Sequence, residues 1–168
     1  MERCEECGFD YDAIARDNVP GVLQALGVRY RDLLSDIDDA VLRAHPLPDT
    51  WSALEYSCHM RDVFRVQRER VQLALSEEEP VFAPMRREER VIEERYNEQQ
   101  PAKVGREITE AAESLAAALE ALDGDAWTRT GIYNYPVTRV RTVEWIGRHT
   151  IHEGEHHLLD IERQVTPG

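Results

Sequence analysis

The chain has 168 residues, of which 42% are apolar and 32% are charged, and its formal net charge is −13. This length and composition predict one globular domain with a single core. The acidic excess argues against a general nucleic-acid binder and against docking on anionic membranes, because both need Lys and Arg. No apolar run approaches the roughly 20 residues of a membrane span, and the acidic start MERCEECGFDYD is unlike a signal peptide. We therefore expect a cytoplasmic protein.

Helical periodicity predicts four long helices, at about residues 18–37, 52–75, 101–122 and 142–164. Ser52 and Glu55 have the spacing of a capping box at the start of the second helix. Pro101 is a favoured first-turn residue at the start of the third. Four helices joined partly by long connections predict an all-α four-helix bundle, whose sites are built from inward side chains of facing helices.

The connections between these helices differ in character. A long, charged connection covers residues 76–100 and contains a short helical piece at about residues 88–96. A turn-rich connection before the last helix contains a short extended hairpin around residues 134–136. We divide the chain into an N-terminal CxxC segment, residues 1–17, and a helical-bundle domain, residues 18–168.

Four of the six histidines lie in IGRHTIHEGEHHLLDI, residues 146–161. His152 and His156 are four residues apart, so on a helix both imidazoles can converge on one ion. His149 continues the same stripe, as a packed or hydrogen-bonded neighbour rather than a ligand. His157 is rotated by about 100° from His156, and we expect it at the surface or in an interface.

A metal site needs a third ligand, and His59 on the second helix lies on a face with apolar neighbours. The predicted metal ligands are therefore His59, His152 and His156. Three imidazoles with an open position describe catalytic zinc, and nickel, cobalt or ferrous iron could be held in the same way. The alternative interpretation is a solvated histidine pair. Glu153 and Glu155 flank the pair and are expected to be solvated.

Four further residues are candidates for the surroundings of this site. Asp62, one turn after His59, could accept its other ring N–H, or it could be solvated. His149 packs beside the ligands. Arg148 could bind a carboxylate or phosphate at the pocket mouth, or pair with the acidic surface. Tyr133 could line the pocket rim or be a packing residue.

The three cysteines are too few for a disulfide framework. Cys4 and Cys7 form a C-x-x-C-G motif, which is half of a zinc-ribbon knuckle whose glycine permits the turn. A complete site needs two more ligands, and the evident candidates are Cys58 with His149 or His157. A second metal site and an inert thiol pair both agree with the motif, whereas a redox pair lacks the strand that should precede it.

The helix order, the segment WSALEYSCHMRD on the second helix and HEGEHHLLDI on the last resemble the DinB-like superfamily of metalloenzymes. The resemblance covers about residues 18–165. It implies a DinB-like bundle with an up-down-down-up helix order, often dimeric, that binds a divalent metal through His59, His152 and His156. The family includes mycothiol-dependent maleylpyruvate isomerases and thiol S-transferases that use bacillithiol or mycothiol.

This resemblance favours a metal-dependent transferase or isomerase that uses a low-molecular-weight thiol, because a bound cation makes the thiol a better nucleophile. The alternatives are metal-assisted hydrolysis with a bound water and a non-enzymatic metal-binding accessory or stress protein. We expect zinc as the ion, a small-molecule substrate and a homodimer, with no nucleic-acid or membrane partner. An open position on the ion would indicate catalysis, whereas a fourth protein ligand would indicate a structural role.

Overall fold

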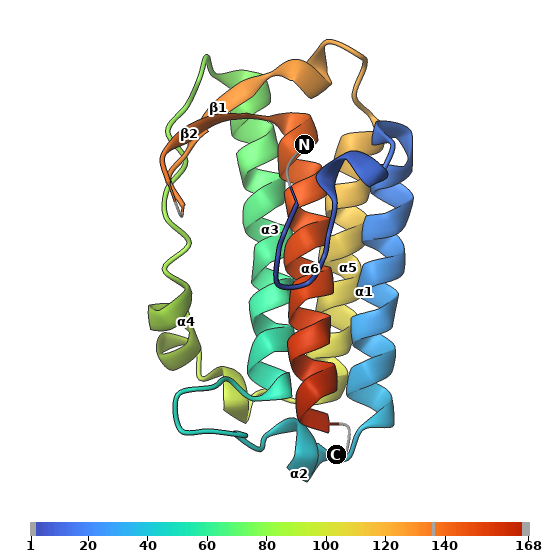
Figure 1. The fold of residues 1–168 in the computed structure, drawn as a ribbon, viewed down its shortest axis with the longest axis vertical. Coiled ribbons are helices and arrows are strands. Elements are labelled where there is room, and N and C mark those ends of the chain that lie inside the picture. Colours follow the sequence, from blue (N-terminus) through green and yellow to red (C-terminus); the bar gives the residue numbers. More distant parts are fainter. Residues whose placement is uncertain (1–2, 136, 166–168) are drawn as a thin grey trace.

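The computed structural model describes residues 3–135 and 137–165. Its four long helices are α1 (Val19–Asp36), α3 (Ala53–Ser76), α5 (Pro101–Glu120) and α6 (Val143–Val165), which form a bundle (Figure 1). The predicted all-α four-helix bundle is therefore confirmed. Residues 166–168 of the predicted domain and Pro136 of the predicted hairpin lie outside the described residues.

The bundle has the up-down-down-up order, since α1 and α6 run one way and α3 and α5 the other (Figure 1). Helix α1 packs against α5 and α6, and α3 packs against the same two helices. Because α3 and α5 are parallel, the chain must return along the bundle between them. Residues 77–100 make this return and include α4 (Arg87–Glu93) and a 3₁₀ turn (Tyr96–Glu98), where the sequence predicts a short helical piece.

A two-stranded antiparallel sheet, β1 (Thr130–Tyr133) and β2 (Arg139–Thr142), precedes α6, with Gly131 paired to Arg141. The return connection is attached to this hairpin. Ile132 N–H donates to the Pro80 carbonyl at 2.8 Å, and Phe82 N–H donates to the Ile132 carbonyl at 3.0 Å. These bonds hold residues 80–87 across one side of the bundle, beside α3.

The smaller elements are α2 (Asp39–Leu42) and the 3₁₀ turns Tyr11–Ala13, Arg16–Asn18 and Ala126–Thr128. Helix α2 lies at one end of the bundle, whereas the turn Tyr11–Ala13 packs along α6 (Figure 1). The predicted capping box is present at the start of α3, where Ser52 N–H donates to the Glu55 carboxylate at 2.8 Å and Glu55 N–H donates to the Ser52 hydroxyl at 3.1 Å. These two bonds satisfy amides that the first helical turn leaves free.

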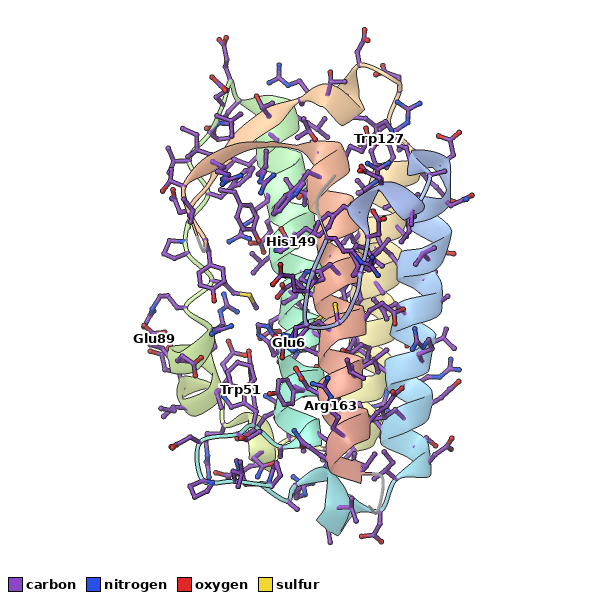
Figure 2. All side chains as sticks on the ribbon, in the orientation of Figure 1. Glu6, Trp51, Glu89, Trp127, His149 and Arg163 are labelled. Atoms are coloured by element: carbon purple, nitrogen blue, oxygen red, sulfur yellow. The ribbon has the colours of Figure 1, made fainter. Side chains whose placement is uncertain are left out.

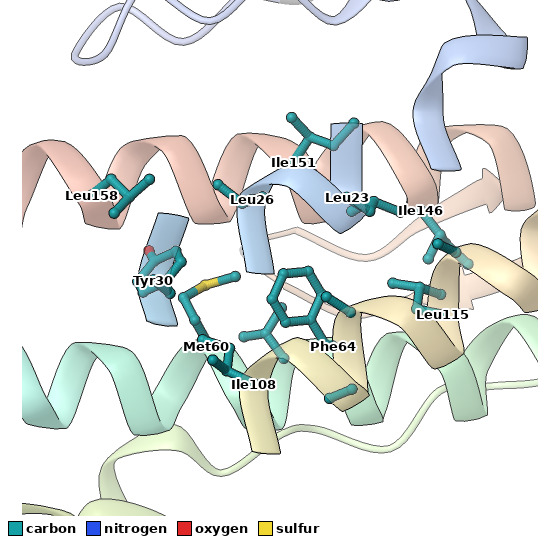
Figure 3. Close-up of a cluster of buried hydrophobic side chains, with 14 of the residues drawn as sticks. Leu23, Leu26, Tyr30, Met60, Phe64, Ile108, Leu115, Ile146, Ile151 and Leu158 are labelled. Atoms are coloured by element: carbon teal, nitrogen blue, oxygen red, sulfur yellow. The ribbon is translucent and has the colours of Figure 1, made fainter. Parts of the chain in front are cut away.

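The core is built from apolar side chains of all four long helices (Figure 3). The largest include Leu23, Leu26, Tyr30, Met60, Phe64, Ile108 and Leu115. Helices α1 and α6 approach closely at Gly154, where a Cβ atom would lie 2.2 Å from Leu26 Cδ2. Tyr30 donates its hydroxyl proton to the Gly154 carbonyl at 2.8 Å across this contact. Within residues 3–135 and 137–165, the helices are too short or too polar to cross a bilayer.

Candidate metal centre

One face of α6 carries Glu153 and His157 toward α3. These residues are four apart and lie in line with Ile146 and Ile161, both completely buried. His59 is 2% exposed and approaches from the neighbouring helix α3. Ligand atoms of His59, Glu153 and His157 all lie within 4.8 Å of one another. We call these three residues the central cluster.

The side chains of the central cluster are held by their neighbours. The rings of His59 and His157 are 5.2 Å apart between centroids, and Nε2 of His157 lies 3.9 Å from a Glu153 carboxylate oxygen. Nδ1 of His157 is 3.1 Å from Asp160 Oδ2. Burial opposes ionisation of Asp160, but its hydrogen bond with His157 lowers the Asp160 pKa. The Trp51 ring packs beside that of His59, with ring centroids 5.2 Å apart.

The central cluster has donor atoms that require a partner. Both ring nitrogens of His59, and Nε2 of His157, are buried without a hydrogen-bond partner among the described residues. Leaving a buried polar atom unpaired costs about 1–3 kcal/mol, and native proteins rarely do so. Burial holds the pKa of His59 well below its ordinary value, so the ring is neutral, which is the form that coordinates metals. Two imidazoles and one carboxylate thus fit a divalent ion such as zinc or ferrous iron.

A cavity of about 200 Å³ opens onto His59 and Glu153. Its walls come from α3, from the return connection and from the hairpin, and they combine apolar with basic side chains. They include Val63, Arg70, Phe82, Met85, Arg87 and Tyr133. Figure 2 shows Trp51 between α3 and α4 on the same side of the bundle. The central cluster is therefore accessible to a small molecule, and the basic side chains favour an anionic one.

Tyr133 and Arg70 form a polar group inside this cavity. The Tyr133 hydroxyl accepts hydrogen bonds from Gln67 Nε2 at 3.0 Å and Arg70 Nη1 at 2.7 Å. Arg70 Nη2 donates to the Ala83 carbonyl at 2.9 Å, which fixes the guanidinium over the Tyr133 ring. Burial raises the pKa of Tyr133, so the hydroxyl keeps a proton that it can donate to a ligand. The sequence left open whether Tyr133 lines the pocket or packs, and it does both.

The structure does not bring the three predicted histidines together. His152 and His156 lie on the neighbouring face of α6, about 100° around the helix from the face that meets His59. Their ligand atoms instead lie within 4.8 Å of those of Cys4 and Cys7. The predicted ligands are therefore divided between two clusters. Neighbouring residues of a helix point about 100° apart, so one face of α6 meets His59 and the next meets the N-terminal cysteines.

Glu153 and His157 are candidate metal ligands that were not predicted from the sequence. We expected Glu153 to be solvated and His157 to lie at the surface or in an interface, but their side chains are only 27% and 12% exposed and face His59. The sequence does contain one signal that the face of α6 with Glu153 and His157 is buried. Ile146 and Ile161 lie at helical spacing on either side of the pair, and apolar residues at both ends of a stripe indicate a buried face.

Asp62 does not contact the ring nitrogens of His59. It is 1% exposed and accepts hydrogen bonds from Arg61 Nε at 2.9 Å and from the Tyr96 hydroxyl. Burial and this hydrogen bond raise the pKa of Tyr96 above its ordinary range. Asp62 therefore joins α3 to the return connection, and it is neither a partner of His59 nor solvated, the two roles that the sequence left open.

His149 and Arg148 have different surroundings. His149 is buried, lines the cavity and stacks on Trp145 with ring centroids 4.3 Å apart, as expected for a packed neighbour. Arg148 donates to the Ile14 carbonyl at 3.1 Å and pairs with Glu144 at 2.9 Å. Arg148 thus attaches the N-terminal segment to α6 and is not among the residues that line the cavity.

The ligand atoms near Cys4 and Cys7 belong to His152 and His156, whereas the sequence suggested Cys58 with His149 or His157. Cys58 is buried in α3, where its thiol donates to the Tyr96 carbonyl at 3.7 Å, and burial raises its pKa to about 12. Cys4 and Cys7 lie beside α6. Burial raises the pKa of Cys7, whereas hydrogen bonds to the Cys4 thiolate outweigh burial and lower its pKa to about 7.

Comparisons with known proteins agree with the fold. A family model described as the DinB superfamily matches residues 23–161. YfiT from Bacillus subtilis, described as a probable metal-dependent hydrolase with an unusual four-helix bundle topology, is similar at a TM-score of 0.79 and 17% identity, over 97% of this chain and 92% of YfiT. A mycothiol-dependent maleylpyruvate isomerase is similar at a TM-score of 0.73 and 17% identity, over 91% of this chain and 63% of the isomerase. No curated protein sequence matched.

Proposed function

This chain belongs to the DinB superfamily, and we propose that it is a metal-dependent enzyme that acts on a small anionic molecule. The observation that carries the proposal is the central cluster, which places two histidines and a carboxylate at the wall of a cavity of about 200 Å³. Structural ions are usually enclosed by four protein ligands, whereas three ligands beside a cavity leave a position for substrate.

The residues of the central cluster have separate roles in this proposal. His59, Glu153 and His157 would hold the ion. Asp160 would orient His157 through the bond to Nδ1, which leaves Nε2 as the ligand atom. When bound, a divalent ion would supply Lewis acidity and lower the pKa of a coordinated water or thiol.

The cavity residues would bind and orient the substrate. Arg70 and Arg87 bring positive charge to the cavity, and a guanidinium pairs well with a carboxylate or a phosphate. Tyr133, fixed by Gln67 and Arg70, would donate its hydroxyl proton to a polar group of the substrate. The ring of Phe82 and other apolar walls exclude water and thereby strengthen these electrostatic contacts.

The donor set favours water as the nucleophile. Two histidines and a glutamate are the ligands of well-known zinc hydrolases. The similar protein YfiT is itself described as a probable metal-dependent hydrolase. We therefore place hydrolysis of a small anionic substrate first.

A transferase or isomerase that uses a low-molecular-weight thiol is the second candidate. The similar fold of a mycothiol-dependent isomerase supports it, and so does the open position, because cations also activate thiols. A panel of small anionic esters, amides and phosphoesters, assayed with and without added thiol, separates the two candidates. Turnover without thiol supports hydrolysis, whereas turnover only with thiol supports the second.

Metal analysis tests the centre itself. We expect Glu153→Gln, which keeps the shape of the side chain, and His59→Ala each to lose one equivalent of divalent metal per chain after dialysis. His45→Ala is the matched control, because His45 is an exposed histidine bonded to the Thr50 carbonyl and lies outside the cluster. If both cluster variants keep the wild-type metal content, the proposed centre is wrong.

A further inference from the structure

A second group of metal-ligating side chains lies where the N-terminal segment, residues 3–14, crosses α6 (Figure 1). Here Cys4 and Cys7 meet His152 and His156, with one ligand atom of each residue within 4.8 Å of the other three. We propose that these four side chains form a closed zinc site that fixes the N-terminal segment to the bundle.

The spacing and the distances both agree with tetrahedral zinc. Cys4 and Cys7 form a C-x₂-C pair, and His152 and His156 form an H-x₃-H pair, as in structural Cys₂His₂ sites. Cys4 Sγ lies 3.8 Å from Nδ1 of His156. Ordinary Zn–S and Zn–N bond lengths at a tetrahedral angle separate the sulfur and nitrogen by about 3.6 Å. The separation of this pair is therefore close to that of two ligands on one zinc ion.

The backbone of the CEECG segment forms a tight turn that carries both cysteines. Gly8 has φ +75°, a conformation that favours glycine, and its N–H donates to the Cys4 carbonyl at 3.0 Å. Cys4 N–H donates to the Phe9 carbonyl at 2.9 Å and closes the turn. This tight turn brings Cys4 and Cys7 together beside His152 and His156.

The two histidines have partners on the ring nitrogens that face away from the thiols. Nδ1 of His152 is 3.0 Å from the Tyr11 hydroxyl, while its Nε2 is buried with no hydrogen-bond partner in the described part of the chain. Nε2 of His156 lies 3.6 Å from a Glu6 carboxylate oxygen and 3.9 Å from one of Asp160, which leaves Nδ1 toward the thiols. Metal-binding histidines usually bond their second nitrogen in this way.

This site differs in chemistry from the central cluster. Two thiolates select zinc over hard cations such as magnesium or calcium. Four protein ligands leave no position for substrate, which indicates a structural role. The rings of Phe9 and Tyr11 each lie 5.4 Å from that of His152, so the ion would complete a contact that the segment already makes with α6.

Cobalt substitution tests the zinc site in the full-length, reduced protein, because cobalt bound to thiolate gives a sulfur-to-cobalt charge-transfer absorption. We expect this absorption in the wild type and its complete loss in the double variant Cys4→Ser/Cys7→Ser. Cys58→Ala is the matched cysteine control and keeps it. Glu153→Gln also keeps it, so failure of the central metal centre is distinguishable from failure of this site. Absence of the band from the wild type, or its persistence in the double variant, overturns the proposal.

A measurement on the wild type alone covers the case in which the double variant does not fold. With zinc added to saturation, Cys4 and Cys7 should resist a thiol-labelling reagent, and a chelator should make both reactive. Peptide mapping identifies which cysteines are labelled. Equal labelling of Cys4 and Cys7 before and after zinc removal contradicts the proposed site.

Discussion

Replacing Gly154 with alanine tests how closely α6 packs on α1. The new Cβ would lie 2.2 Å from Cδ2 and 3.0 Å from Cγ of Leu26, a side chain that is 1% exposed. Either Leu26 must leave its position or the two helices must separate. Such overpacking costs about 1–3 kcal/mol, and the better helix propensity of alanine offsets about 1 kcal/mol of it. We expect a net loss of about 1 kcal/mol of unfolding free energy, and at most about 2 kcal/mol.

Gly21→Ala is the matched control for this variant, because a Cβ at Gly21 in α1 meets nothing within 4 Å. It should stabilise the protein by up to about 1 kcal/mol. Urea unfolding of both variants, with metal removed by chelator, compares them without a contribution from binding. Leu26→Ala should be less costly in the Gly154→Ala background than in the wild type, because the new methyl group fills part of the space. Equal stability of the two alanine variants would refute the close contact.

Two further predictions concern the helix start and the buried tyrosine. Ser52→Ala removes the cap of α3 and should lower the unfolding free energy by about 1 kcal/mol, seen as a lower urea midpoint at an unchanged m-value. Burial raises the pKa of Tyr30 well above its ordinary value, so above about pH 10 only the unfolded chain releases this proton. Below that pH the Tyr30 hydroxyl causes no loss of unfolding free energy. Above it the unfolding free energy falls by about 1.4 kcal/mol per pH unit because of this group, and Tyr30→Phe should remove that contribution to the pH dependence. An unchanged alkaline slope in Tyr30→Phe would contradict the burial of the hydroxyl.

The fold could be predicted because its signals are local. Apolar residues at three- and four-residue steps mark each long helix, and Ser52 with Glu55 marks the start of α3. The long connection at residues 77–100 is what allows α3 and α5 to run parallel, and its length is visible in the sequence. The ion pair of Asp62 with Arg61 was not predictable, because both residues are charged and neither periodicity nor spacing indicates their burial.

The site could be predicted only in part, because helical spacing gives the faces of α6 but not which neighbour covers each face. His59 was correctly expected to point inward, and it does so at 2% exposure. His156 and His157 are adjacent in the sequence. The close contact between α1 and Gly154 sets the rotation of α6 about its axis, and this rotation fixes which of the two histidines faces α3. The meeting of Cys4 with His156 joins residues 152 positions apart, a separation that no local pattern reports.

The most direct test of the central claim is an anomalous difference map from crystals of the zinc-loaded protein. We predict a peak among His59, Glu153 and His157, bonded to two imidazole nitrogens and a carboxylate, with a coordination position that faces the cavity. The same map of Glu153→Gln should lack this peak. A wild-type map with no peak at the central cluster, from protein that binds zinc elsewhere, would contradict the account.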